Sequence, residues 1–204
     1  ETNINIKATI DGVKMFIPLD PDNRHYAEIL RQVAAGEYSI GSPFTEKMRN
    51  QNELRRKVIL SKNTWIMDRE CSEALWSRLS NPNTPHNTTA NQATSMLPQI
   101  DVSHDDIASM LNSVNKQIAT FGSLRLPTES EWEIACRANK ESPYSFNPVS
   151  ETISQYCNLA DASSQLEWAD QHVNDGFKER APVASFKANT WGLPDVAVHV
   201  EEAP

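Results

Sequence analysis

The chain has 204 residues, a formal net charge of −8 and twice as many prolines (12) as glycines (6). This length suits a single domain, or one domain with a small appendage. The negative charge argues against a nucleic-acid partner held through phosphate contacts, and no apolar run reaches the length of a membrane span. We therefore expect a loop-rich globular protein with no nucleic acid and no membrane span.

The first 35 residues predict a hairpin followed by a helix. Residues 4–17 alternate between apolar and polar side chains around Asp11-Gly12, a pair that is typical of a hairpin turn. Asp20 or Asp22 can then cap a helix, and Gly36 can end it. The apolar stripe of this helix would consist of Tyr26, Ile29, Leu30 and Val33.

The next segment favours short strands. Residues 37–42, 57–62 and 64–67 are rich in β-forming side chains. Asp68 follows as a possible cap for a short helix. That helix would carry Cys71, Leu75, Trp76 and Leu79. Residues 80–99 are rich in Asn, Thr, Pro and Ser without periodicity, which predicts a surface loop.

Two further helices have clear start signals. Ser103 with Asp106, and Thr128 with Glu131, have the spacing of capping boxes, in which each side chain satisfies a free backbone N–H. The first helix would bury a stripe made of Ile107, Leu111, Val114 and Ile118, and the second a face made of Trp132, Ala135 and Cys136. Its glutamates, Glu129, Glu131 and Glu133, are interpreted as cap and surface carboxylates. Short strands, two good helices and long polar connections indicate the α+β class.

Two strings carry a family resemblance. RLPTESEWEIACRA at residues 125–138 and PVASFKANTWGL at residues 182–193 belong to four ordered blocks that resemble the formylglycine-generating enzyme family, also called the sulfatase-modifying factor family. The resemblance covers roughly residues 36–196 and implies a C-type lectin-like fold. We expect a hairpin-and-helix attachment segment at residues 1–35. A lectin-type domain, C-terminally truncated or degenerate, would follow at residues 36–204.

The family's chemistry is a copper-dependent oxidation of a substrate cysteine, and it uses a cysteine pair near the family's C-terminus. None of Cys71, Cys136 and Cys157 stands at the position that the resemblance assigns to that pair. The related iron-dependent branch needs a His-rich triad that the sequence lacks. We therefore predict no catalytic residues and no enzymatic activity. The three cysteines are either small buried thiols, or one disulfide with a spare thiol.

The resemblance also implies one calcium site. The matching positions are the side chains of Asn158 and Asp175 and the backbone carbonyls of Leu159 and Phe177. Ca²⁺ prefers six to eight such oxygen ligands. The alternative is that Asn158 and Asp175 cap turns, since Asp-Gly is itself a turn pair.

The opening segment resembles bacteriophage tail-associated proteins. The predicted function is therefore a non-catalytic binding or structural protein, a virion, receptor-binding or display protein of a phage or prophage tail. Its partners would be other virion or tail proteins, or a cell-surface receptor, and it would act as an oligomer. It would reside in the virion, in the bacterial cytoplasm during assembly, or on an extracellular surface. The alternative is a fragment of a copper-dependent formylglycine-generating oxidase, or of a related sulfoxide synthase, that modifies cysteine-containing substrates.

Overall fold

The computed structural model divides into two compact units. The first comprises residues 1–28 and 71–126, and the second comprises residues 29–70 and 127–204. The structure describes residues 5–10, 13–18, 30–46, 49–80, 96–119, 122–142, 144–146 and 152–196. Among the helices within these ranges, none combines the length and the apolar character that a membrane crossing requires.

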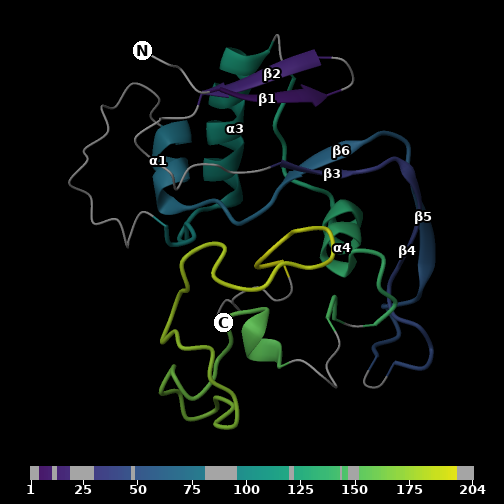
Figure 1. Cartoon of the computed structure of the whole chain (residues 1–204), viewed down its shortest axis with the longest axis vertical. Coiled ribbons are helices and arrows are strands. Elements are labelled where there is room, and N and C mark those ends of the chain that lie inside the picture. The colour runs from purple at the N-terminus through teal and green to yellow at the C-terminus, as the bar shows by residue number, and fades with distance from the viewer. Residues whose placement is uncertain are drawn as a thin grey trace. The chain divides into compact units, whose positions relative to one another are not determined.

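The described residues of the first unit form a hairpin and two helices (Figure 1). Strands β1 (Asn5–Ile10) and β2 (Val13–Pro18) pair antiparallel, with Ile10 opposite Val13, so the predicted hairpin is confirmed. Helix α1 spans Glu73–Ser80 and helix α3 spans His104–Ile118. The predicted loop at residues 80–99 lies mostly outside the described residues.

The predicted N-cap is wrong for helix α1 and confirmed for helix α3. The Leu75 N–H donates to Ser72 Oγ at 3.2 Å, so Ser72 caps α1, and the predicted Asp68 cap is wrong. Helix α3 has the predicted capping box, because the Asp106 N–H donates to Ser103 Oγ at 3.1 Å and the Ser103 N–H donates to the Asp106 carboxylate at 2.9 Å. Local spacing alone cannot tell which of two nearby polar residues becomes the N-cap of a helix.

The second unit is built on a long, bent two-stranded ribbon (Figure 1). Strand β3 (Leu30–Val33) pairs antiparallel with β6 (Thr64–Met67), and β4 (Gly36–Ile40) pairs antiparallel with β5 (Arg56–Leu60). The bend lies between the two pairs, where the Ala35 N–H donates to Asn63 Oδ1 at 2.8 Å. The strands predicted in this part of the sequence are confirmed.

One expectation fails at β3. The sequence pattern placed Leu30 and Val33 on a helix, whereas they lie in a strand opposite Met67 and Thr64. Helical spacing was a weak preference, and pairing with β6 together with burial of Val33 (2% exposed) outweighs it. The remainder of that predicted helix, residues 19–29, lies outside the described residues.

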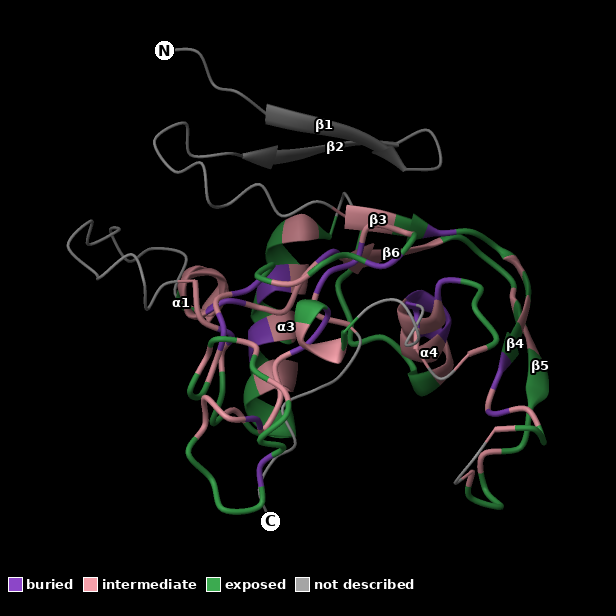
Figure 2. Ribbon diagram, turned by 60° about the horizontal axis from the view of Figure 1, so that its bottom comes forward, coloured by how far each residue is buried: buried purple, intermediate pink, exposed green. Residues whose placement is uncertain are grey.

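Helix α4 (Glu129–Arg137) packs against β4 and contributes to the core of the second unit. Its capping box is confirmed: the Glu131 N–H donates to Thr128 Oγ1 at 3.3 Å, and the Thr128 N–H donates to Glu131 at 2.8 Å. Figure 2 shows buried positions on α4, which are Glu131, Ile134 and Ala135. The core cluster consists of Val33, Ile40, Ile134, Ala135 and Leu193.

The buried face of α4 is rotated from the predicted one. Glu131 is only 7% exposed and accepts a hydrogen bond from Thr64 Oγ1 at 3.2 Å, so its interpretation as a surface carboxylate is wrong. Trp132 and Cys136, predicted on the inner face, are only partly buried. The carboxylate is tolerated inside because its oxygens accept several hydrogen bonds.

The final described segment, residues 152–196, is mostly irregular apart from the 3₁₀ turn η1 (Ile153–Gln155). The side chain of Asn189 joins this segment to α4 by hydrogen bonds. Its amide donates to the carbonyls of Ala135 at 2.8 Å and Cys136 at 3.2 Å, which a helix end leaves without internal partners. Its Oδ1 accepts from the N–H groups of Trp191 and Leu193.

Candidate functional site

None of the three cysteines forms a disulfide, and their surroundings differ. Cys157 is 1% exposed, and its thiol donates to the carbonyl of Ile153. Burial raises the pKa of Cys157 to about 12, with the Asp175 charge adding to the effect, and burial raises the pKa of Cys136 to about 11. Thiolates, not thiols, bind soft metals and attack substrates. Because both pKa values lie well above 7, the thiols of Cys136 and Cys157 are protonated at neutral pH and are not in this reactive form.

The predicted calcium-site residues lie in one network of loop hydrogen bonds. The Leu159 N–H donates to Asp175 Oδ2 and the Phe177 N–H donates to Asp175 Oδ1, both at 2.7 Å. The Asn158 amide donates to the Glu179 carbonyl at 2.6 Å. Within the ranges that the structure describes, no group of three or more His, Cys, Asp and Glu side chains is arranged to hold a metal.

The centre of this network is Asp161, which the site prediction did not include. Its carboxylate is completely buried and accepts the N–H groups of Ser163, at 2.8 Å, and Asp175. Burial works to raise the pKa of Asp161, but the hydrogen bonds from Ser163 and Asp175 outweigh it, and the pKa lies below its ordinary value. The Ser163 hydroxyl also bonds to the Phe177 carbonyl, which ties the two halves of the network together.

These contacts allow a test of whether the residues fit a calcium ion. The set offers an amide oxygen, a carboxylate and two carbonyls, all of which are ligand types that Ca²⁺ accepts. Each oxygen of Asp175 already accepts one N–H and keeps further lone-pair capacity. The donor types therefore fit, while the turn-capping alternative accounts for the Asp175 contacts that the structure describes.

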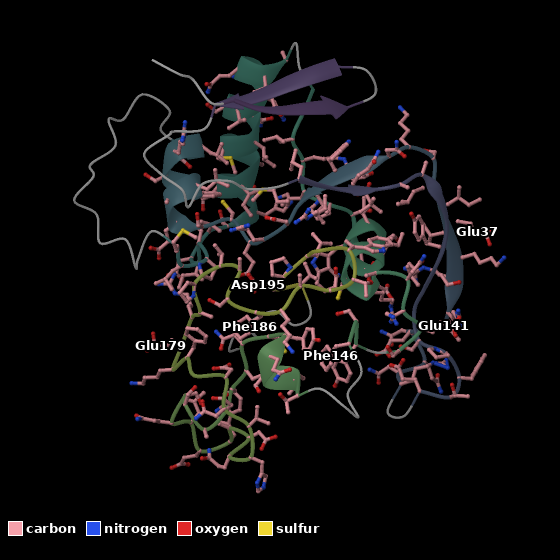
Figure 3. The ribbon with its side chains drawn as sticks, in the orientation of Figure 1. Glu37, Glu141, Phe146, Glu179, Phe186 and Asp195 are labelled. Carbon is pink, nitrogen blue, oxygen red and sulfur yellow. The ribbon has the colours of Figure 1, made fainter. Side chains whose placement is uncertain are left out.

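A group of buried and partly buried charges lies elsewhere in the second unit. Asp68, only 2% exposed, accepts two hydrogen bonds from Arg69 and lies 3.8 Å from Arg31. Burial, with the charge of Asp195, raises the pKa of Glu70 to about 7. Burial also raises the pKa of Asp195, although N–H groups of Ala184 and Phe186 oppose the shift. Figure 3 labels Asp195 and Phe186 in the C-terminal loops.

Arg31 connects this group to the C-terminal loop. Its Nε donates to the Gly192 carbonyl at 3.2 Å. Gly192 has φ +78°, a conformation that favours glycine, and a Cβ there would make a tight contact of 3.2 Å with the Arg31 guanidinium. The Trp-Gly-Leu string therefore has a structural role, and the neighbouring Trp191 ring packs edge-on against Tyr38 at 6.1 Å between centroids.

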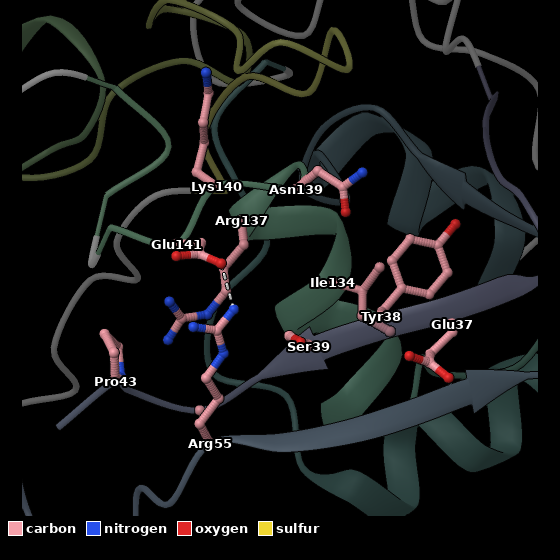
Figure 4. A pocket seen from close by; sticks show the side chains of 11 residues that line it. Glu37, Tyr38, Ser39, Pro43, Arg55, Ile134, Arg137, Asn139, Lys140 and Glu141 are labelled. Atoms are coloured by element: carbon pink, nitrogen blue, oxygen red, sulfur yellow. Dashed lines mark hydrogen bonds and ion pairs between the residues drawn. The ribbon is translucent and has the colours of Figure 1, made fainter.

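The second unit also contains a polar cavity of about 210 Å³ (Figure 4). It lies beside β4, the start of β5 and the C-terminal end of α4. Three cationic side chains line it, namely Arg55, Arg137 and Lys140, together with the carboxylates of Glu37 and Glu141. Figure 3 shows Glu37 and Glu141 in this part of the unit.

The wall of the cavity is held by Glu133, which accepts the Gly41 N–H at 2.7 Å and Arg137 Nε at 2.6 Å. Gly41 has φ +80°, and a Cβ there would lie 2.5 Å from the Leu54 carbonyl oxygen. Only glycine therefore lets β4 approach the loop before β5. Glu133 is thus a structural tie between β4 and α4, which corrects its interpretation as a surface carboxylate.

The sequence profile of the sulfatase-modifying factor enzyme 1-like domain matches residues 20–203, nearly the whole chain. The chain belongs to this family. It is 33% identical over 86 residues to the formylglycine-generating enzyme of Mus musculus, which is 41% of this chain and 22% of that enzyme. It is also 33% identical over 87 residues, 41% of this chain and 27% of the relative, to the formylglycine-generating enzyme of Thermomonospora curvata. The matches thus span about a quarter of these relatives' length.

The fold is similar to that of a solved structure. The structure of PvdO from Pseudomonas aeruginosa superposes with a TM-score of 0.64 at 19% identity, covering 82% of this chain and 66% of that one. At this identity the likeness concerns the fold alone. It agrees with the mixed architecture of helices and strands described above.

Sequence reasoning found the family but missed most of the residues that organise its site regions. Asp161 was visible in the Asn-Leu-Ala-Asp block, yet nothing in its spacing marked it as the buried hub. Arg55, Arg137 and Glu141 come from two distant segments, and only folding brings them to one cavity. The signal that could have found Asn189 was its place in the family string PVASFKANTWGL.

Proposed function

We propose that this chain is a non-catalytic binding or structural scaffold of the sulfatase-modifying factor family, with a C-type lectin-like arrangement of its loops. The observation that carries the proposal is the state of the thiols. No disulfide joins the three cysteines, and two of them lie in surroundings that keep their thiols protonated. A reactive pair would need partly exposed thiolates beside a cation or a metal.

The residues present do not fit the copper that the family's oxidation requires. Copper held by cysteines needs two thiolates side by side, whereas the protonated Cys157 thiol donates a hydrogen bond to the Ile153 carbonyl. We therefore derive no oxidation step from these side chains.

The test is an oxidation assay on the full natural gene product. A cysteine-containing substrate peptide is incubated with copper-loaded protein, and the aldehyde product is measured by mass spectrometry, with the Thermomonospora curvata enzyme as positive control. We expect no product above the protein-free background. Product formation that disappears when Cys71, Cys136 and Cys157 are all replaced by Ser would overturn the proposal.

The enzyme alternative rests on the 33% identity to two formylglycine-generating enzymes. In that case the oxidation assay is positive, and the activity survives replacement of these three cysteines, because the reactive pair lies in another part of the gene product. The same assay therefore separates a scaffold from part of an oxidase.

Within the scaffold class, we propose a phage or prophage tail-associated role, as an oligomer bound to other virion proteins or to a cell-surface receptor. The support is the resemblance of residues 1–35 to tail-associated proteins. Particles purified from the source bacterium after prophage induction, analysed by mass spectrometry, should contain this chain in fixed ratio to tail proteins. Its absence from such particles would contradict the role.

We also propose that calcium binds at Asn158, Leu159, Asp175 and Phe177. Calcium that binds only the folded state raises its stability by about 2.7 kcal/mol at a concentration of 100 times the dissociation constant. Thermal unfolding in CaCl₂ and in EGTA measures this. We expect calcium to stabilise the wild type but not Asp175→Asn. The control is Asp170→Asn, which calcium should still stabilise; the Asp170 carboxylate accepts the His172 N–H of a neighbouring turn at 2.8 Å. An equal response of all three proteins would contradict this site.

A further inference from the structure

The cavity between β4 and α4 has the composition of an anion-binding site. Its lining brings three cations and two carboxylates around a volume of about 210 Å³. Each carboxylate already has a cationic partner, since Glu37 lies 2.6 Å from Lys57 and Glu141 lies 2.5 Å from Arg55. Arg137 in turn pairs with Glu133 at 2.6 Å, so the positive charge in excess of these pairs is that of Lys140.

Two of the cations differ in how firmly they are held. Arg137 donates to Glu133 at 2.6 Å and to the Ser142 carbonyl at 3.3 Å, and its side chain is 15% exposed. A guanidinium has five N–H donors, so Arg137 retains donors for a ligand. Because Glu133 is itself fixed by the Gly41 N–H, Arg137 is already oriented before any ligand arrives.

Arg55 is held in a different manner. Its partner Glu141 is 73% exposed at the side chain, and Arg55 itself is 38% exposed. Ion pairs with this exposure contribute little to stability because water competes for both charges. The Glu141 carboxylate thus bonds to one nitrogen of the Arg55 guanidinium, where an incoming carboxylate can replace it (Figure 4).

The size and the remaining lining restrict the ligand. Cavities for drug-sized molecules measure roughly 300–1,000 Å³, so this one suits a single small unit. Ser39 and Asn139 offer polar groups to hydroxyls, and the ring of Tyr38 offers one apolar surface. Lys140 adds a flexible charge at the edge. A small hydroxylated acid, of the size of one sugar, fits this combination.

We propose that the cavity binds a small polar carboxylate, such as a sugar acid, which displaces Glu141 from Arg55 and is oriented by Arg137. The arrangement makes Glu141 an internal competitor for the site. Binding here does not depend on the thiols, so this proposal and the non-catalytic function can fail independently of each other.

The experiment is a titration of the full chain with D-glucuronate in 0.15 M salt, followed by NMR chemical shifts or calorimetry, with D-glucose as the uncharged counterpart. We expect glucuronate to bind and glucose to bind at least 10-fold more weakly. Arg55→Gln should weaken glucuronate binding at least 10-fold. Glu141→Gln should tighten it about 3-fold or more, because the competitor has lost its charge.

Arg56→Gln is the matched control. Arg56 follows Arg55 directly and carries the same charge, but its side chain does not line the cavity. It should leave the affinity unchanged. The proposal is overturned if glucuronate does not bind, if glucose binds equally well, if Arg56→Gln weakens binding as much as Arg55→Gln, or if Glu141→Gln weakens binding.

Discussion

Helices α3 and α4 begin with the same local device and are held in different ways. Each has a hydroxyl N-cap with an acid three residues later, and both halves of each capping box form. In α3, two of 15 residues are buried, whereas in α4 three of nine are buried, one of them the capping Glu131. An identical start signal therefore says little about how deeply a helix is embedded.

The helix ends show the same difference. On α3, Asn115 braces the following loop through two exposed hydrogen bonds to the Leu124 backbone, at 2.7 and 2.9 Å. At α4 the loop braces the helix, because Asn189 donates to two α4 carbonyls from a buried position. Asparagine therefore makes exposed hydrogen bonds to a nearby segment in the first unit and buried hydrogen bonds to a distant segment in the second.

The largest expected effect comes from removing the buried tie. Asn189→Ala leaves two carbonyls and two N–H groups without their partner, and we expect a loss of about 3 kcal/mol in the free energy of unfolding. The matched change Asn115→Ala exposes its partners to water and should cost about 1 kcal/mol. Urea unfolding followed by tryptophan fluorescence measures both. Equal losses would remove the distinction between the two helices.

The next effect is pH dependent and belongs to the second unit. The folded-state pKa of Glu70 is raised from 4.5 to about 7, so the folded state holds this proton more tightly than the unfolded chain. The resulting stabilisation is full below about pH 4.5 and is lost as pH rises through about 7. Over this range we expect the wild type to lose about 1–2 kcal/mol relative to Glu70→Gln, after allowance for the partial exposure of Glu70.

The measurement is urea unfolding of both proteins at pH 4.5, 6 and 8. Glu167→Gln, in an exposed loop of the same unit, is the control and should follow the wild type at every pH. Parallel curves for wild type and Glu70→Gln would show that Glu70 does not retain its proton in the folded state.

The smallest expected effect compares the two N-caps directly. Replacing a hydroxyl cap by Ala costs about 1 kcal/mol, with a range of about 0.5–2 kcal/mol. Ser103→Ala should lie near the lower end because its surroundings are exposed, and Thr128→Ala nearer the upper end because Thr128 also orients the buried Glu131. The same unfolding assay decides this, and a larger loss for Ser103→Ala would reverse the ranking.

Much of the fold could be predicted from the sequence wherever the signal was local. The hairpin β1–β2, the strands from Gly36 to Met67 and both capping boxes follow from turn residues, β-forming side chains and cap spacing. The family was also recognisable from two short strings. At the candidate sites, the grouping of Leu159, Asp175 and Phe177 was predicted, whereas Asp161 and the cavity were not.

The errors have a common physical cause. Leu30 and Val33 have the spacing of a helix, but hydrogen bonds to β6, more than 30 residues away, make them a strand. Glu131 and Glu133 are charged and therefore look exposed, but Thr64 and Gly41 bind them from other segments. In each case a long-range partner outweighs a local preference.

The sequence by itself determined where the β1–β2 hairpin turns, where helices α3 and α4 start, and which family the chain belongs to. Only the tertiary structure decided which carboxylates are buried, which thiols stay protonated and that Arg55, Arg137 and Glu141 share one cavity. The reason is that caps and turns are satisfied within four or five residues of backbone. Burial and charge pairing, in contrast, depend on segments that meet only after the chain has folded.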